Sequence, residues 1–212
     1  MTQYIFSVRD TRTYLNDQPF LVKGLRCSNA LISDAATVQL IDNLGTFESH
    51  GVNAVSVYLM GSRFGDVQGY LSEGQLSPIH AQRMRHIIEA SDAHGMAVLV
   101  GCLYWSNSRA VWPHWTQVEA EAAIRNTVLW LADHDYRNTF VDVDNEGMAQ
   151  RHGDIDDKAL LRAGKAAAPG VVMGTNYRGD PLPEADLALH FSHKDPTKPY
   201  IETEGSPPSG LP

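Results

Sequence analysis

The run Ala97-Val-Leu-Val-Gly-Cys-Leu103 is apolar at nearly every position, so both faces of the segment are suited to burial. A short run of this kind is typical of a strand inside a parallel sheet that is covered on both sides. Similar runs recur along the chain at residues 20–25, 54–59, 139–143, 171–174, 187–191 and 199–201. The sequence therefore predicts about seven buried strands.

Helix signals separate the early strands. The start signals are Asp34, the pair Ser77-Pro78, the capping box Thr116-Gln-Val-Glu119 and Asp156. The matching stop signals are glycines at positions 51, 95 and 170. Helices that alternate with buried strands imply βα units joined into a parallel sheet.

These patterns favour an α/β fold of the (β/α)8 TIM-barrel type, with a doubly wound sheet as the alternative. From Val171 onward the strands follow one another with little room for helices, and the chain ends eight residues after Glu204. A full barrel has eight strands and about 250 residues. We therefore expect residues 1–212 to form one domain, a barrel with about seven strands present and the C-terminal strand and helix missing.

Composition narrows the class of protein. The 212 residues carry a formal net charge of -8, and the basic residues are scattered, which argues against a nucleic acid partner. No apolar stretch is long enough to span a bilayer, and the first six residues lack the pattern of a signal peptide. The chain as given is expected in the cytoplasm, or outside the cell if a leader is missing. Cys27 and Cys102 are expected to be buried thiols.

Two carboxylates follow two of the predicted strands. Thr139-Phe-Val-Asp-Val-Asp-Asn-Glu-Gly147 delivers Glu146 to a loop, and Lys198-Pro-Tyr-Ile-Glu-Thr-Glu-Gly205 delivers Glu204. In a barrel, the loops after the strands meet on one face, where active sites lie. A pair of carboxyl groups on that face is the requirement for cleaving a glycosidic bond. The other candidate substrate-binding residues on that face are Arg26, Asn29, Arg63, Tyr104, Trp105, Asn145, Asn176, Tyr177, His190 and His193.

The same segments carry a family resemblance. Residues 20–24, 51–55, 144–146 and 198–205 occur in an order that resembles the clan A glycoside hydrolases, most nearly the family 5 cellulases and mannanases. The resemblance implies a retaining β-glycoside hydrolase acting by double displacement on a β-linked oligo- or polysaccharide. It implies that Glu146 is the acid/base, that Glu204 is the nucleophile and that Asn145 binds the sugar 2-hydroxyl. It implies no metal and no cofactor.

The chain also departs from the family pattern. Ser56 stands where family 5 enzymes usually have an arginine that supports the nucleophile, so Arg26 or Arg63 would take that role. Leu103 stands where a histidine is usual. No tyrosine follows His190, and Tyr177 is the candidate replacement.

Two other functions fit the same residues. A barrel of this kind could bind carbohydrate without cleaving it. A metal-dependent barrel hydrolase could draw its ligands from Asp142, Asp144, Glu146, His190, His193 and Glu204. Carbohydrate is the expected partner of both a glycoside hydrolase and a carbohydrate-binding barrel. A second copy of the chain could cover the open edge of an incomplete barrel.

Overall fold

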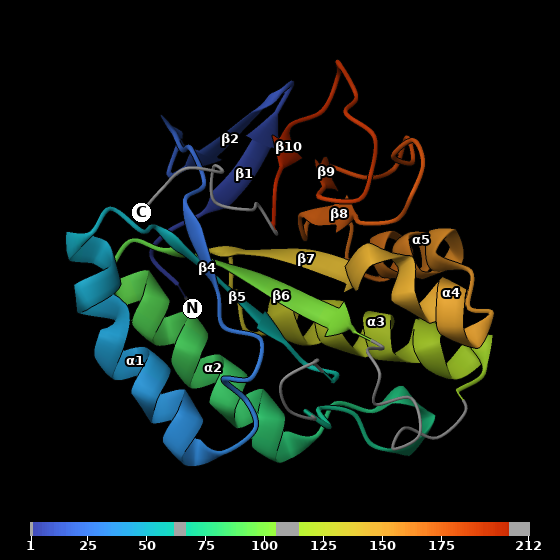
Figure 1. The fold of residues 1–212 in the computed structure, drawn as a ribbon, viewed down its shortest axis with the longest axis horizontal. Coiled ribbons are helices and arrows are strands. Elements are labelled where there is room, and N and C mark those ends of the chain that lie inside the picture. The colour runs from blue at the N-terminus through green and yellow to red at the C-terminus, as the bar shows by residue number, and fades with distance from the viewer. Residues whose placement is uncertain (1, 62–66, 105–114, 204–212) are drawn as a thin grey trace, which may run out of the picture.

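A curled sheet of seven parallel strands forms the centre of the protein (Figure 1). The computed structural model describes residues 2–61, 67–104 and 115–203. Along the sheet the strands follow the order of the chain: β4 (Gly24–Arg26), β5 (Ala54–Tyr58), β6 (Ala97–Leu103), β7 (Thr139–Asp144), β8 (Met173–Thr175), β9 (Leu187–Leu189) and β10 (Tyr200–Ile201). Every neighbouring pair is parallel. The predicted partial (β/α) barrel is confirmed.

Helices cover the outer face of this sheet. They are α1 (Asp34–Ser49), α2 (Pro78–Ala93), α3 (Gln117–Asp133), α4 (Met148–Gly153) and α5 (Asp157–Ala167), together with the short 3-10 segments η1 (Ser72–Gly74) and η3 (Asn145–Gly147). Figure 1 shows α1 and α2 beside one another at one end and α4 and α5 at the other. The capping box of α3 is present, and Asp156 caps α5.

One predicted cap was wrong by a residue, and one helix was not predicted. The side chain of Ser33, not of Asp34, accepts the N-terminal hydrogen bond of α1, from the Ala36 amide at 3.1 Å. Asp34 is the first helical residue, where a negative charge favours the helix dipole. The short helix α4 carries no strong start signal of its own, because its N-cap is Gly147 in the left-handed conformation.

The sheet has a different core on each face. Val98 and Val100 of β6 point outward, into the apolar layer beneath the helices. Leu99, between them, points inward with Phe140 of β7 and Leu187 of β9. This alternation is the period of two that a strand imposes on its side chains.

A second sheet, at the N-terminus, packs against the inner face of the main sheet near the start of β7. It is antiparallel and consists of β1 (Phe6–Arg9), β2 (Arg12–Leu15) and β3 (Gln18–Pro19). The ring of Phe6 stacks on Phe140 at 4.7 Å between centroids, and Phe20 meets Phe6 edge-on at 6.1 Å. The strand expected over residues 20–25 is shorter and begins later, as β4 at Gly24–Arg26. Phe20 lies outside it and packs on Phe6.

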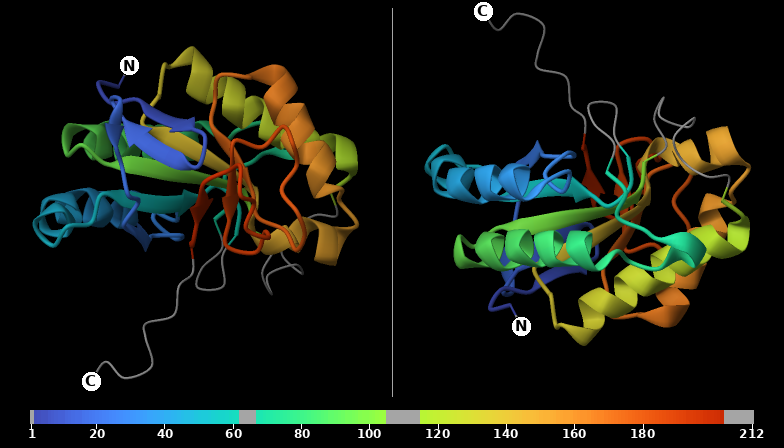
Figure 2. Two further views of the ribbon diagram at one scale, coloured as in Figure 1. Left: turned by 90° about the horizontal axis from the view of Figure 1, so that it is seen from above. Right: turned by 90° about the horizontal axis from the view of Figure 1, so that it is seen from below.

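The two edges of the main sheet differ from its middle. β4 and β10 are three and two residues long, and neither pairs with a described strand on its outer side. Views along the sheet show that the curl stops short of a closed barrel (Figure 2). A cavity between the two edges is lined from one side by Gly24 and Leu25 and from the other by Ile201 and Glu202.

Candidate active site

The carboxyl end of β7 turns sharply at Glu146. This residue has φ 55° and ψ 24°, and Gly147 follows with φ 61°. A left-handed conformation is unusual for a residue with a side chain, and such strain concentrates at functional sites. The Glu146 side chain is 16% exposed, and its Oε2 lies 3.5 Å from an Arg151 nitrogen. The turn therefore holds one carboxylate at the rim of the sheet.

Asn145 immediately precedes Glu146 in the chain and is fully buried. Its Oδ1 accepts hydrogen bonds from the Tyr58 hydroxyl at 3.0 Å and the Arg26 guanidinium at 3.1 Å, with the Asn176 amide at 3.5 Å. Its Nδ2 is buried and has no hydrogen-bond partner in the described part of the chain. A buried amide donor without an acceptor is costly, so this group is suited to meeting a polar atom of a ligand.

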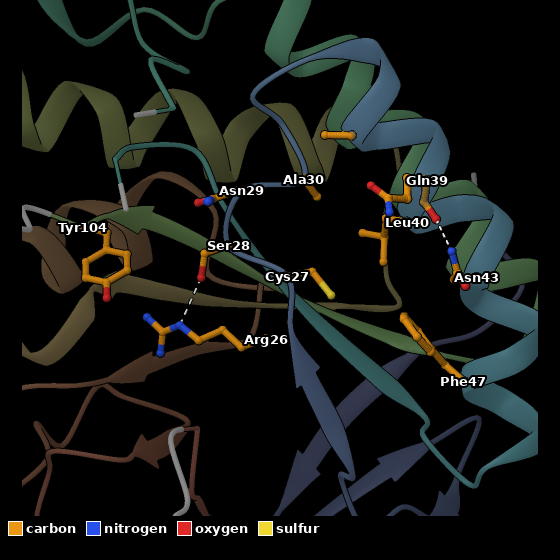
Figure 3. Close-up of a pocket in the computed structure, with 11 residues that line it drawn as sticks. Arg26, Cys27, Ser28, Asn29, Ala30, Gln39, Leu40, Asn43, Phe47 and Tyr104 are labelled. Carbon is orange, nitrogen blue, oxygen red and sulfur yellow. Dashed lines mark hydrogen bonds between the residues drawn. The ribbon is translucent and has the colours of Figure 1, made fainter. Parts of the chain in front are cut away.

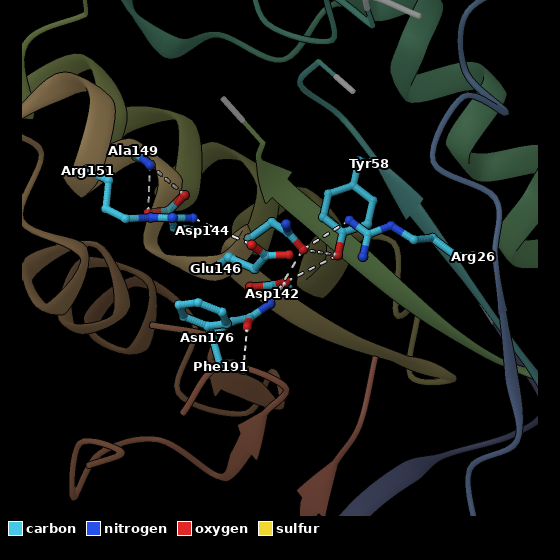
Figure 4. Close-up of polar contacts among 10 residues, drawn as sticks. Arg26, Tyr58, Asp142, Asp144, Glu146, Ala149, Arg151, Asn176 and Phe191 are labelled. Carbon is cyan, nitrogen blue, oxygen red and sulfur yellow. Dashed lines mark hydrogen bonds and ion pairs between the residues drawn. The ribbon is translucent and has the colours of Figure 1, made fainter. Parts of the chain in front are cut away.

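Asp142 supports the same group from within the sheet (Figure 4). Its Oδ2 accepts from Asn176 Nδ2 at 2.7 Å and from the Tyr58 hydroxyl at 3.2 Å. Burial raises the pKa of Asp142 to about 6, although these hydrogen bonds and Arg26 act in the opposite direction. Asn176 in turn accepts from the Phe191 amide at 3.1 Å. The ends of β5, β7 and β8 are thus joined to the segment after β9.

Asp144 holds the loop that follows Glu146. Both of its carboxylate oxygens lie 2.9 Å from the Ala149 amide, at the start of α4. Burial raises the pKa of Asp144 well above its usual range. Asp142 and Asp144 are therefore buried polar residues that orient their neighbours.

Arg26 reaches the site from the end of β4. Its guanidinium lies over the rings of Tyr58 and Tyr104, 4.9 and 5.0 Å from their centroids, and its Nε donates to Ser28 at 3.0 Å. In the sheet register Arg26 is opposite Ser56. Position 56 is a serine, but Arg26 lies next to it on the adjacent strand, and its guanidinium reaches Asn145.

The ring of Tyr58 lies flat across the next strand. Tyr58 pairs with Gly101 in the register, and a Cβ at Gly101 would be 2.0 Å from the ring. Glycine is therefore required there for the tyrosine to reach Asn145. Tyr58 was not predicted as a site residue, although a tyrosine at the end of a buried strand is a usable signal.

The side of the site near β10 has its own polar group. His190 Nδ1 pairs with the carboxylate of Glu202. The Tyr200 hydroxyl lies 3.0 Å from the other carboxylate oxygen of Glu202 and 2.7 Å from the His190 carbonyl oxygen. Glu202 is thus engaged by two partners on the strand that leads to Glu204.

Two of the expected binding residues lie apart from Asn145. His193 Nδ1 is 2.9 Å from an oxygen of Asp180, and the His193 side chain is 64% exposed. The Tyr177 hydroxyl donates to the Asp180 carbonyl at 2.9 Å. Tyr177 follows β8 and His193 follows β9, and both side chains contact Asp180. The tyrosine that follows β8 is therefore not directed at the Asn145 group.

The structure brings together five of the residues expected from the sequence: Arg26, Tyr104, Asn145, Glu146 and Asn176. Asn29 lies beside them, in the wall of a cavity of about 670 Å³ that extends from Arg26 and Tyr104 to α1 (Figure 3). Glu204, Arg63 and Trp105 lie outside the described residues.

The cysteines are free thiols, and Cys27 is in the wall of the cavity in Figure 3. Burial raises the pKa of Cys27 to about 11 and that of Cys102 to about 12. Both thiols therefore stay protonated near neutral pH.

In the described part of the chain, no three or more His, Cys, Asp or Glu side chains are grouped as metal ligands. No helix within the described ranges has the length and apolar character needed to cross a bilayer.

Comparison with known proteins gives a result only at the level of structure. No family model matches the chain, and no curated protein matches it by sequence. Among solved structures, a glycoside hydrolase family 5 protein from Bacteroides vulgatus matches 94% of this chain at 16% identity, with a TM-score of 0.66. A β-1,4-D-mannanase from Cryptopygus antarcticus matches 82% of it at 12% identity, with a TM-score of 0.57.

The matched proteins are longer. The chain covers 53% of the Bacteroides vulgatus protein and 57% of an endocellulase from Pyrococcus horikoshii, to which it is 14% identical with a TM-score of 0.56. Identities this low establish the fold and not the activity. The family 5 resemblance read from the sequence is confirmed for the fold: this chain has the architecture of part of a family 5 glycoside hydrolase barrel.

Proposed function

We propose that the chain is a retaining β-glycoside hydrolase in which Glu146 is the acid/base and Glu204 the nucleophile. The observation that carries the proposal is the buried group around Asn145, from which the strained turn presents Glu146 at the rim. The likeness of the fold to cellulases and mannanases supports it. Its substrate would be a β-linked oligo- or polysaccharide.

Asn145 has a defined part in this proposal. Its buried Nδ2 has no hydrogen-bond partner among the described residues, while its Oδ1 is held by Tyr58 and Arg26. A sugar hydroxyl placed next to Glu146 would supply the missing acceptor. Hydrogen bonds to the 2-hydroxyl that strengthen in the transition state contribute several kcal/mol in glycosidases.

In the first step, Glu146 would donate a proton to the leaving oxygen while Glu204 attacks the anomeric carbon and forms a glycosyl ester. In the second step Glu146, now ionised, would remove a proton from water as water attacks that carbon and releases Glu204. Arg26 is the candidate to support the nucleophile, because its strand adjoins Ser56 and its guanidinium lies within the same polar group.

The first test compares Glu146→Ala with Glu204→Ala on aryl β-glycosides that differ in leaving group. Glu204→Ala should abolish hydrolysis of every substrate. Glu146→Ala should lower the rate about 10²–10⁴-fold for poor leaving groups and much less for activated ones, because these need no proton. Glu184→Ala is the matched control, since that side chain pairs with Arg162 on the surface. Wild-type rates in either site variant would remove the role assigned to it.

The same preparation separates the alternatives. Oligosaccharide binding with no release of reducing ends would indicate a carbohydrate-binding barrel, and loss of activity on adding a chelator would indicate a metal-dependent hydrolase. Retention is tested by following the anomeric configuration of the first product by NMR. A product of inverted configuration would contradict the proposed double displacement.

We also propose that a second copy of the chain covers the open side of the sheet. Leu25 of β4 is 40% exposed and nearby Leu21 is 75% exposed. β4 pairs only with β5 among the described strands, which leaves one row of its backbone groups available. An exposed strand edge with apolar side chains is suited to pairing with another chain.

A further inference from the structure

A pair of arginines flanks the rim beside Glu146. The guanidinium of Arg151, in α4, lies 5.4 Å from the centroid of the Phe191 ring, and that of Arg178 lies 5.5 Å from the same centroid. These three residues follow β7, β8 and β9 in turn, on the side of the sheet where Asn145 and Glu146 lie. Figure 4 shows Arg151 and Phe191 on either side of Glu146.

The loops that carry this pair are fastened to each other and to the site. The His193 amide donates to the Gly179 carbonyl at 2.8 Å, and the Ser192 hydroxyl donates to the Thr175 carbonyl at 2.8 Å. The Phe191 amide donates to Asn176, whose own amide reaches Asp142. The ring that the arginines share is therefore held in place before any ligand arrives.

The guanidinium donors of these arginines are little used within the protein. Arg178 is exposed and, among the described residues, pairs with no carboxylate. Arg151 lies 3.5 Å from Glu146, longer than the 2.7–2.9 Å of a strong charge-assisted bond. An arginine stacked on a ring keeps its N–H groups at the edge of the guanidinium, where they can bind an anion in bidentate fashion.

We infer that the sugar taken by this site carries an anionic group, a carboxylate or a sulfate, bound by Arg151 and Arg178. This inference rests on the proposed function and names its substrate class. A neutral sugar would leave Arg178 without a counterion among the described residues and Arg151 with only its 3.5 Å contact to Glu146. The formal net charge of the chain is -8, so this pair is a local feature and not part of a generally basic surface.

The test compares three probes that differ only at C6: methyl β-D-glucopyranoside, its 6-carboxylate analogue methyl β-D-glucopyranosiduronate, and its 6-sulfate. Each is titrated into the full chain at two salt concentrations, and binding is followed by the NMR chemical shifts of the protein. At least one anionic probe should bind about tenfold more tightly than the neutral one, the gain expected from a charge-assisted hydrogen bond. That gain should shrink at high salt.

Variants assign the effect to these residues. Arg178→Gln and Arg151→Gln should each remove most of the preference for the anionic probe. Arg178→Gln should leave binding of the neutral probe unchanged. Arg178→Lys should keep part of the preference, because lysine retains the charge without the planar fork. Arg162→Gln, which alters an exposed arginine of α5 that pairs with Glu184, is the matched control and should have no effect.

The outcomes separate the two proposals. Equal binding of all three probes, or a preference that survives both glutamine variants, would overturn the anionic-sugar inference while leaving the glycoside hydrolase proposal standing. Binding of none of the probes, together with no hydrolysis of aryl β-glycosides, would overturn both. The relative affinity of the carboxylate and sulfate probes identifies which anionic group the site prefers.

Discussion

The end of β7 and the open edge formed by β4 and β10 are built in opposite ways. All residues of β7 are buried, and the strand pairs with a neighbour on each side. Leu25 of β4 is 40% exposed, and the residues of β10 are only half-buried. The β7 end carries Asn145 and Glu146, whereas the β10 end leads towards Glu204.

The difference shows how the two proposed carboxylates would be supported. Glu146 follows a buried polar group, in which the Tyr58 hydroxyl lies 3.0 Å from Asn145 Oδ1 and 3.2 Å from Asp142 Oδ2. The β10 end is ordered by contacts nearer the surface, such as the pair of His190 and Glu202. A partial barrel can therefore hold one of the two proposed catalytic side chains in place without a closed sheet.

The largest expected effect is in the core. Phe140→Ala removes a ring that is 1% exposed and stacks on Phe6, so it should lower the free energy of unfolding by about 3–5 kcal/mol. Leu25→Ala, at the edge, should cost less than about 1 kcal/mol because much of its side chain already faces solvent. Urea denaturation of both variants measures the contrast, and equal losses would contradict it.

The next contrast is in pH dependence. The folded-state pKa of Asp142, about 6, lies above its ordinary 3.8, so the unfolded chain gives up the proton first. The stability that Asp142 contributes is greatest below about pH 4 and declines as the pH rises to about 6, by up to about 3 kcal/mol. Asp142→Asn should remove this slope, as measured by urea denaturation across that range.

Asp195, in the turn before β10, should show the opposite sign. Its side chain accepts hydrogen bonds from the Thr197 hydroxyl and amide, which hold its pKa below the ordinary 3.8. Its contribution is therefore present above about pH 4 and is lost as the pH falls further. Asp195→Asn should reduce the sensitivity to acid, and a slope of the same sign as that of Asp142 would refute this assignment.

A matched pair of tyrosines sharpens the comparison. The Tyr58 and Tyr200 hydroxyls each lie within hydrogen-bond distance of two acceptors. Tyr58 is fully buried, whereas Tyr200 is half-exposed. Tyr58→Phe should cost about 1–3 kcal/mol, since it leaves buried acceptors unsatisfied, whereas Tyr200→Phe should cost less than about 1 kcal/mol because water can replace the hydroxyl. Comparable losses in the two variants would show that burial does not decide the difference.

The smallest effect on stability is expected from Leu25→Lys. It should change the free energy of unfolding by less than about 0.5 kcal/mol, as for other exposed positions. If a second copy covers this edge, the same change should weaken self-association, because a lysine on an edge strand opposes pairing. Sedimentation at several protein concentrations tests this, with Leu129→Lys on α3 as an equally exposed control. Identical association of wild type and Leu25→Lys would exclude this edge as the interface.

Much of the fold could be read from local patterns. The limits of β6 at Ala97 and Leu103 and the capping box of α3 at Thr116 and Glu119 agree with the sequence interpretation, because continuous apolar runs and caps are local signals. The antiparallel sheet at the N-terminus was missed. Its strands are short, and Phe6 is recognisable as a core residue only through its contact with Phe140, far along the chain.

The sequence by itself determined the order of the seven parallel strands and of helices α1, α2, α3 and α5, and it placed Asn145 and Glu146 at a strand end. Periodicity, caps and strand ends depend on near neighbours in the chain. Tertiary structure alone decided that Arg26, Tyr58 and Asn176 converge on Asn145, and that two arginines share the ring of Phe191. These contacts join residues from separate strands and loops. Their distances follow from the curl and register of the sheet, which no local pattern records.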